Sequence, residues 1–124
     1  MNVYIAGKFS AQARLREIRG RIRQAHILVT SSWMDEVAGE YPVPRQRALN
    51  TGSADLREVS MADLLILDTL DVSETGGREV EFGFALAQGT RVWLVGPVRN
   101  IFHEFAEEHF ESWDEVFVAL GEEG

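Results

Sequence analysis

The stretch Asp63-Leu64-Leu65-Ile66-Leu67-Asp68 decides the fold of this chain. Its unbroken aliphatic run between two aspartates is too apolar for a strand that keeps one face in water. Such strands belong to the middle of parallel sheets, where helices cover both faces. We therefore expect an α/β domain with residues 63–68 as its central strand.

Outward from this strand, short apolar runs alternate with helical patterns. Further strands are predicted at residues 3–6, 26–30 and 91–97 and near Phe110. Helices are predicted over residues 15–25, 53–62, 78–88, 100–108 and from 112 onward, where Ser112-Trp113-Asp114-Glu115 matches a capping box. Residues 31–50 should form a long irregular segment, and such segments usually have a function. This order predicts a three-layer α/β domain with a five-stranded parallel sheet.

Length and composition narrow the function classes. The 124 residues fit a single domain spanning 1–124, and the 45% apolar and 26% charged fractions are typical of globular proteins. A formal net charge of −8 disfavours binding to DNA or RNA, and no apolar run is long enough to span a membrane. The absence of cysteine, together with an N-terminus unlike a signal peptide, leads us to expect a cytoplasmic protein.

In sheets of this class, ligands bind outside the carboxyl ends of the strands, where the strand order reverses. That rule directs attention to the loops at residues 7–10, 30–50, 68–77 and 96–100. Within the third loop, Gly76 and Gly77 precede a helix and could hold an anion on free N–H groups, although two glycines alone favour a plain turn.

Glu81 is the most unusual residue, because the helix around it is otherwise apolar nearly all round. Burying an unpaired carboxylate is costly, so the residue needs an explanation. One explanation is structural: a salt bridge to Arg78, one turn earlier, or a solvent-facing position. The other is functional, since the small neighbours Gly77, Gly83 and Ala85 leave room for a ligand.

Asp55 is the second candidate, near the start of the predicted helix that leads into the central strand. An Asp in a first helical turn often caps the helix or offsets its dipole. Two carboxyl groups on helices flanking one strand end could also meet over the sheet. A pair separated by about 5 Å, one a nucleophile and one a proton donor, is what retaining glycosyl transfer requires.

Cofactor motifs are absent from the sequence. It contains neither GxGxxG nor GxxxxGK[ST], so no dinucleotide or nucleoside-triphosphate fingerprint is present. His26, His103 and His109 lack metal-ligand spacing, and the last two are predicted to lie in an acidic surface stretch. We expect no cofactor and no metal.

Four stretches of the chain resemble the nucleoside 2-deoxyribosyltransferase family: Tyr4-Ile5-Ala6-Gly7-Lys8-Phe9-Ser10, Ala54-Asp55-Leu56, Ala62-Asp63-Leu64-Leu65-Ile66-Leu67 and Gly76-Gly77-Arg78-Glu79-Val80-Glu81-Phe82-Gly83-Phe84-Ala85-Leu86-Ala87-Gln88-Gly89. They occur in matching order over nearly the whole chain, and the last is the most specific. The resemblance implies a flavodoxin-like fold, an enzyme that moves a 2-deoxyribosyl group between nucleobases, and a deoxynucleoside or deoxynucleotide with a nucleobase as its ligands.

The resemblance also implies roles for individual residues. Glu81 matches the glutamate that attacks the anomeric carbon, and Asp55 matches the aspartate that exchanges a proton with the base. Tyr4 matches the tyrosine that holds the nucleophile. Asn100 matches an asparagine that reaches the sugar in a neighbouring subunit, which implies a homo-oligomer with shared active sites. The remaining expected substrate-binding residues are Gly7, Lys8, Phe9, Ser10, Trp33, Asp35, Gly76 and Gly77.

Two alternatives stay open. A related hydrolase would cleave the N-glycosidic bond of a nucleoside 5′-monophosphate, with Lys8, Ser10 and Arg14 binding the phosphate at a helix N-terminus. Many transferases carry a sugar-binding aspartate shortly before the nucleophile, whereas this chain has Ser-Glu-Thr at residues 73–75. This difference from the family argues against efficient transfer between bases. The second alternative is a nucleotide-binding module without catalysis. Trp33 could equally anchor its loop to the core.

Overall fold

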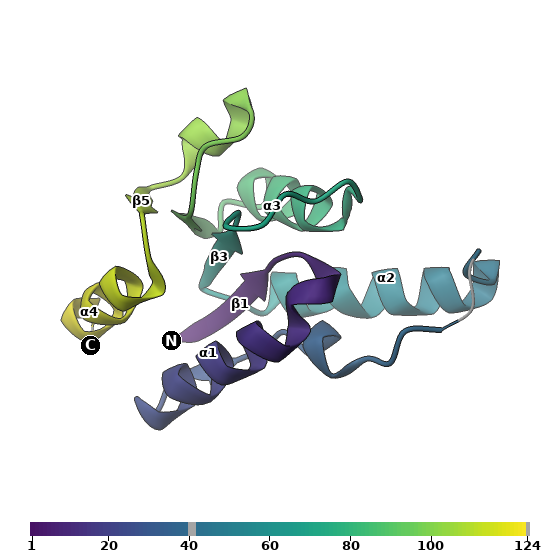
Figure 1. Cartoon of the computed structure of the whole chain (residues 1–124), viewed down its shortest axis with the longest axis horizontal. Coiled ribbons are helices and arrows are strands. Elements are labelled where there is room, and N and C mark those ends of the chain that lie inside the picture. Colours follow the sequence, from purple (N-terminus) through teal and green to yellow (C-terminus); the bar gives the residue numbers. More distant parts are fainter. Residues whose placement is uncertain (40–41, 124) are drawn as a thin grey trace.

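The computed structural model describes residues 1–39 and 42–123, and its centre is a five-stranded parallel sheet (Figure 1). The strand order is β2-β1-β3-β4-β5, and every neighbouring pair is parallel. The strands are β1 (Asn2–Ala6), β2 (Leu28–Val29), β3 (Leu64–Asp68), β4 (Arg91–Val95) and β5 (Glu108–Phe110). All five residues of β3 are buried, which confirms the prediction of a covered central strand.

Two helices cover each face of the sheet (Figure 1). The first layer is α1 (Gln12–Gln24) with α4 (Trp113–Glu123), joined where the Arg21 guanidinium lies 4.0 Å from the centroid of the Phe117 ring. The second is α2 (Arg45–Ser60) with α3 (Gly77–Ala87), joined where the Gln88 amide donates to the Val59 carbonyl. Three short 3₁₀ helices, η1 (Phe9–Ala11), η2 (Trp33–Asp35) and η3 (Ile101–Phe105), lie in the loops after β1, β2 and β4. The predicted three-layer architecture is confirmed.

The region between β2 and β3 differs from the sequence prediction. A long irregular segment was expected to residue 50, but α2 begins at Arg45, directly after Pro44. Residues 45–50 are exposed, so this part of α2 has no buried stripe to give a helical period. Figure 1 shows α2 extending away from the sheet at this end. Residues 40 and 41 of the expected loop lie outside the described part of the chain.

Two other predicted boundaries were wrong. His26 adopts a positive φ of 63° after α1, a left-handed conformation common just past a helix end, so the second strand starts only at Leu28. The predicted helix over residues 100–108 is the shorter η3, after which the chain enters β5. The predicted capping box is half formed: Ser112 Oγ accepts from the Glu115 N–H, while the Glu115 carboxylate accepts from Glu111 N–H.

Asp68 fixes the carboxyl end of β3 in the core. Its carboxylate accepts hydrogen bonds from Arg14 at 2.8 Å, from the Trp113 indole at 2.8 Å and from the Leu70 N–H at 3.0 Å. Strand order reverses between β1 and β3, so the loops that follow these two strands border the expected ligand site. Among the described residues no helix is long and apolar enough to cross a membrane.

Candidate active site

Tyr4 and Glu81 form a buried pair over the sheet. Tyr4 lies on β1 with no exposed surface, and Glu81, in the second turn of α3, is 9% exposed. The Tyr4 hydroxyl donates a hydrogen bond to Glu81 Oε2. The structural explanation considered above, a salt bridge from Glu81 to Arg78, is absent among the described residues. Instead Arg78 donates to the main-chain oxygens of Asp68 and Asp71.

The ionisation of Glu81 is set by opposing effects. Burial raises the pKa of Glu81 to about 8, and the hydrogen bond from Tyr4 opposes that rise. The negative charges of Asp55 and Glu58 raise this pKa further. Burial, and then the charge of Glu81 and the hydrogen bond to it, raise the pKa of Tyr4 well above its usual range, so Tyr4 keeps its proton and acts as a hydrogen-bond donor.

Asp55 lies in the third turn of α2, not in a first turn as predicted, so the capping interpretation was wrong. Its side-chain atom Oδ1 is buried and has no hydrogen-bond partner among the described residues. Burial, with the charges of Glu36 and Glu58, raises the pKa of Asp55 to about 7. A carboxyl group with this pKa both donates and accepts a proton near neutrality, as a general acid–base group must.

Two adjoining cavities lie beside the loops that follow β1 and β3, and Asp55 lines one of them. The α2 cavity, of about 490 Å³, is lined by Asp55 together with Phe9, Glu36, Arg47 and Thr75, among others. The β1 cavity, of about 460 Å³, is lined by Lys8, Phe9, Ser10 and residues 72–75. Because Phe9 and Thr75 line both, the two cavities adjoin at the reversal of strand order. Tyr4 and Glu81 are not among the lining residues of either cavity.

Of the three residues considered for phosphate binding, two line the β1 cavity. Lys8 and Ser10 lie there at the start of η1. Arg14 is already engaged, because its guanidinium binds Asp68 at 2.8 Å and Asp71 at 3.0 Å. Of these two basic residues, only Lys8 has no ion pair among the described residues.

The expected glycines fall into two groups. At Gly7 a Cβ atom would come within 2.7 Å of the end of the buried Leu15 side chain, so a larger residue there would have to displace that side chain. At Gly76 and Gly77 a Cβ atom would meet nothing within 4 Å, and Gly76 has ordinary right-handed backbone angles. These two positions are open, and nothing in the backbone requires glycine.

Trp33 and Asp35 make contacts within the chain. Trp33 is 5% exposed and its indole donates to the Ile5 carbonyl at 2.7 Å, which makes it a core anchor. Asp35 accepts two hydrogen bonds from Arg19, at 2.6 and 2.7 Å, and this guanidinium lowers the pKa of Asp35. Neither residue is among the lining residues of the two cavities.

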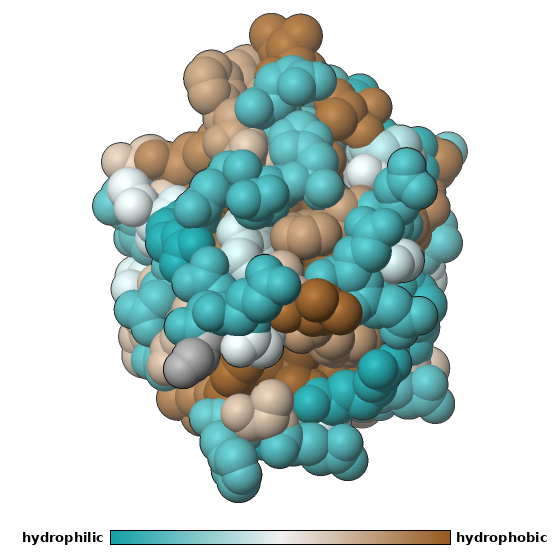
Figure 2. Space-filling view, turned by 90° about the vertical axis from the view of Figure 1, so that its left-hand side faces the viewer, coloured by the Kyte–Doolittle hydropathy of each residue, from teal (hydrophilic) through white to brown (hydrophobic). Residues whose placement is uncertain are grey.

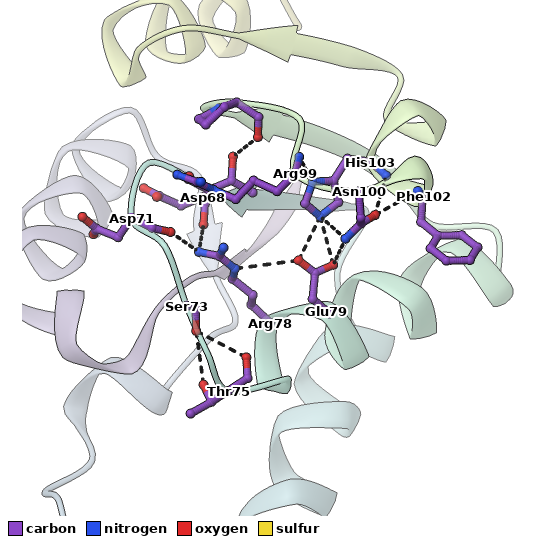
Figure 3. Close-up of polar contacts among 12 residues, drawn as sticks. Asp68, Asp71, Ser73, Thr75, Arg78, Glu79, Arg99, Asn100, Phe102 and His103 are labelled. Atoms are coloured by element: carbon purple, nitrogen blue, oxygen red, sulfur yellow. Dashed lines mark hydrogen bonds and ion pairs between the residues drawn. The ribbon is translucent and has the colours of Figure 1, made fainter.

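Asn100 is part of a polar cluster around the buried His103 (Figure 3). Its Oδ1 accepts from the N–H groups of Phe102 and His103, while its Nδ2 donates to Glu79. The prediction of a surface position for His103 was wrong: its ring is fully buried and contacts Glu79 at 2.9 Å. The Arg99 N–H donates to His103 Nδ1, so Nε2 carries the proton toward Glu79. This cluster fastens η3 to α3, two residues from Glu81.

Sequence reasoning missed several residues of this region. Glu36 and Arg47 line the α2 cavity, and Glu58 affects the pKa of both Asp55 and Glu81. The Asp55-x-x-Glu58 spacing on a helix was the only available signal, because residues three apart share a helix face. Among the described residues no group of His, Cys, Asp and Glu could hold a metal ion.

No protein-family model matches the chain, and no curated protein matches it significantly in sequence. Solved structures do match. A 2-deoxyribosyltransferase of Bacillus psychrosaccharolyticus is similar with a TM-score of 0.75 and 18% identity, over 94% of this chain and 90% of that one.

Two further structures have the same fold. A conserved protein of Enterococcus faecalis V583 matches with a TM-score of 0.77 and 18% identity, over 100% of this chain and 99% of the other. A CMP N-glycosidase of Clostridium botulinum matches with a TM-score of 0.61 and 15% identity, over 98% and 99%. The chain thus has the flavodoxin-like fold of these proteins, which include an enzyme of the family that its motifs resemble.

Proposed function

We propose that this chain is an enzyme that breaks N-glycosidic bonds, and specifically that it transfers a 2-deoxyribosyl group between nucleobases through a covalent glycosyl–Glu81 intermediate. Two carboxyl groups carry the proposal: the buried Glu81, held by the Tyr4 hydroxyl, and Asp55, which lines a ligand-sized cavity and has a buried oxygen without a hydrogen-bond partner among the described residues. Structures of this fold that include a 2-deoxyribosyltransferase and a CMP N-glycosidase support it.

The reaction follows from the two carboxyl groups. A Glu81 oxygen attacks the anomeric carbon, the bond from that carbon to the base nitrogen breaks, and the bonding electrons go to the base. Asp55 supplies the proton that the departing base takes up. In the second half an incoming base gives a proton to Asp55 and its nitrogen attacks the same carbon, which releases the Glu81 carboxylate.

Tyr4 assists by holding Glu81. Its hydroxyl fixes one carboxylate oxygen and leaves the other for attack, and it favours the ionised form of Glu81 against the effect of burial. Glu81 does not line either cavity, yet substrate has to reach it from there. In this proposal side chains such as Phe9 therefore shift when substrate binds.

A second candidate function is hydrolysis of the same bond in a nucleoside 5′-monophosphate, with water taking the place of the incoming base. The position of Lys8 and Ser10 in the β1 cavity, next to the α2 cavity, favours it, since a 5′-phosphate would lie there while the base lies near Asp55.

We also propose that the protein forms a homo-oligomer. Val80, Phe84, Ile101, Phe102 and Phe105 form an apolar surface across α3 and η3, and their exposed fractions run from 36% to 76%. Figure 2 shows apolar surface gathered at the top of the molecule, where η3 lies in Figure 1. Large contiguous apolar patches typically mark interfaces. The absence of cysteine supports a cytoplasmic location, the compartment we propose.

The test is product analysis with thymidine plus adenine, run beside deoxynucleoside monophosphates. Deoxyadenosine formed by the wild type, and reduced at least about a thousandfold in Glu81→Ala, is the expected result. If free base and deoxyribose phosphate form from a monophosphate, the activity is hydrolysis and not transfer. Ligand binding without either product, unchanged in Glu81→Ala, would instead identify a binding module.

A further inference from the structure

The α2 cavity contains a carboxylate that the proposed reaction does not use. Glu36 and Asp55 both line this cavity, and the charge of Glu36 contributes to the raised pKa of Asp55. Glu36 comes from the loop after η2, whereas Asp55 comes from α2. Carboxyl groups from two separate segments of the chain thus line one cavity.

The backbone at Glu36 is fixed. Its N–H donates to the Trp33 carbonyl at 3.1 Å, and its carbonyl accepts from the Gln12 side chain at 2.9 Å. Trp33 is itself anchored to β1 through Ile5. Because both main-chain groups are hydrogen-bonded to buried or half-buried elements, the Glu36 side chain starts from a rigid position, as a specificity residue requires.

We infer that Glu36, together with Asp55, makes the site selective for nucleobases that carry an amino group next to an unprotonated ring nitrogen, as in cytosine and adenine, over their oxo counterparts uracil and hypoxanthine. This inference rests on the proposed function, since it names the class of base that the Asp55 end of the site accepts.

The hydrogen-bond inventory gives the reason. A protonated Asp55 donates to the ring nitrogen, while its other oxygen accepts one N–H of the amino group, so the unpartnered Oδ1 gains a partner. The amino group has a second N–H, which an ionised Glu36 accepts. An oxo base presents only lone pairs at that position, which a carboxylate repels.

Arg47 keeps Glu36 suited to this role. It also lines the α2 cavity, and its guanidinium donates to the Val37 carbonyl at 3.0 Å, next to Glu36. Burial and Glu58 raise the pKa of Glu36, and the positive charge of Arg47 opposes them. Arg47 is therefore a positioning residue that favours the charged form of Glu36.

The experiment measures binding rather than turnover. Calorimetry compares cytosine with uracil and adenine with hypoxanthine on the wild type, and the corresponding deoxynucleosides and 5′-monophosphates on Glu81→Ala. We expect the amino member of each pair to bind about tenfold or more tightly, which is the discrimination typical of one well-placed hydrogen-bonding pair. An equal or stronger affinity for the oxo members would overturn the inference.

A series at position 36 isolates the residue. Glu36→Ala should bring the ratio of affinities for the amino and oxo members of each pair close to one. Glu36→Gln, whose amide also donates, should shift this ratio toward the oxo bases. Glu104→Gln, at an exposed position of η3, is the matched control and should leave the ratio unchanged. An unchanged ratio in Glu36→Gln contradicts the inference.

The outcomes separate this inference from the proposed reaction. Amino-selective binding that depends on Glu36, without any glycosyl transfer or hydrolysis, would support the inference and reject the reaction. Turnover without selectivity for amino bases would support the reaction and reject the inference. If none of these bases, nucleosides or nucleotides binds, both are wrong.

Discussion

At the scale of single residues, the raised pKa values of Glu81 and Asp55 define when the proposed chemistry works. The attacking form needs Glu81 ionised and Asp55 protonated, and burial raises their pKa values to about 8 and about 7. Activity should then rise with pH up to about 7 and fall above about 8, because Glu81 gains its charge and Asp55 loses its proton over this range. A profile of kcat/KM from pH 5 to 10 checks this, and a flat profile would contradict it.

Tyr4→Phe tests the hydrogen bond to the nucleophile. The hydrogen bond from this hydroxyl lowers the pKa of Glu81, so without it this pKa should rise further. We expect a lower maximal rate, by about tenfold to a hundredfold, and a pH optimum displaced to higher pH. A loss of rate with an unchanged pH profile would show that Tyr4 acts only through packing.

Glu81→Gln tests how ionisation of the buried carboxyl group affects the stability of the fold. Its pKa is raised from 4.5 to about 8, so the folded state retains a proton that the unfolded state has lost, and stability falls as pH rises between these values. In the Gln variant, position 81 does not titrate, so this decrease in stability with pH is absent. Its Tm relative to the wild type should increase by several degrees between pH 5 and pH 8.5. Thermal unfolding at both pH values measures it, and an equal Tm difference at the two would refute it.

At the scale of elements, the cluster of Glu79, Asn100 and His103 ties η3 to α3. His103→Leu would leave the Arg99 N–H and the Glu79 carboxylate without their buried partner. We expect a loss of about 1 to 3 kcal/mol in the free energy of unfolding, measured by urea denaturation. Glu104→Gln, on the exposed surface of the same 3₁₀ helix, should change it little. Equal stability of both variants would contradict a structural role for the cluster.

The elements also show where sequence patterns stopped being informative. The strands at residues 64–68 and 91–95 were predictable because their apolar runs are continuous. The start of α2 was not, because its exposed first half has no apolar stripe. The buried position of His103 depends on acceptors and donors supplied by α3 and the chain after β4, which the local acidic sequence does not reveal.

At the scale of the whole molecule, the apolar surface of α3 and η3 predicts self-association. Phe105→Lys and Ile101→Lys, at side chains 67% and 76% exposed, should weaken assembly because they place charges in an apolar contact. Light scattering after size-exclusion chromatography should report an oligomer for the wild type and smaller species for the variants. Val118→Lys, 65% exposed on α4, is the matched control outside this surface. A monomeric wild type would reject the proposal.

The sequence alone determined the α/β class, the parallel sheet and its central strand, because uninterrupted aliphatic strands have no stable position other than between two layers of helices. It also singled out Glu81 and Asp55 as carboxyl groups in need of an explanation. The tertiary structure alone decided that Tyr4 holds Glu81, that Asp55 lines a cavity with Glu36, and that Trp33, Asp35 and Arg14 have partners inside the chain. The reason is physical: a side chain's pKa and partners depend on burial and on charges from other elements, which no local pattern contains.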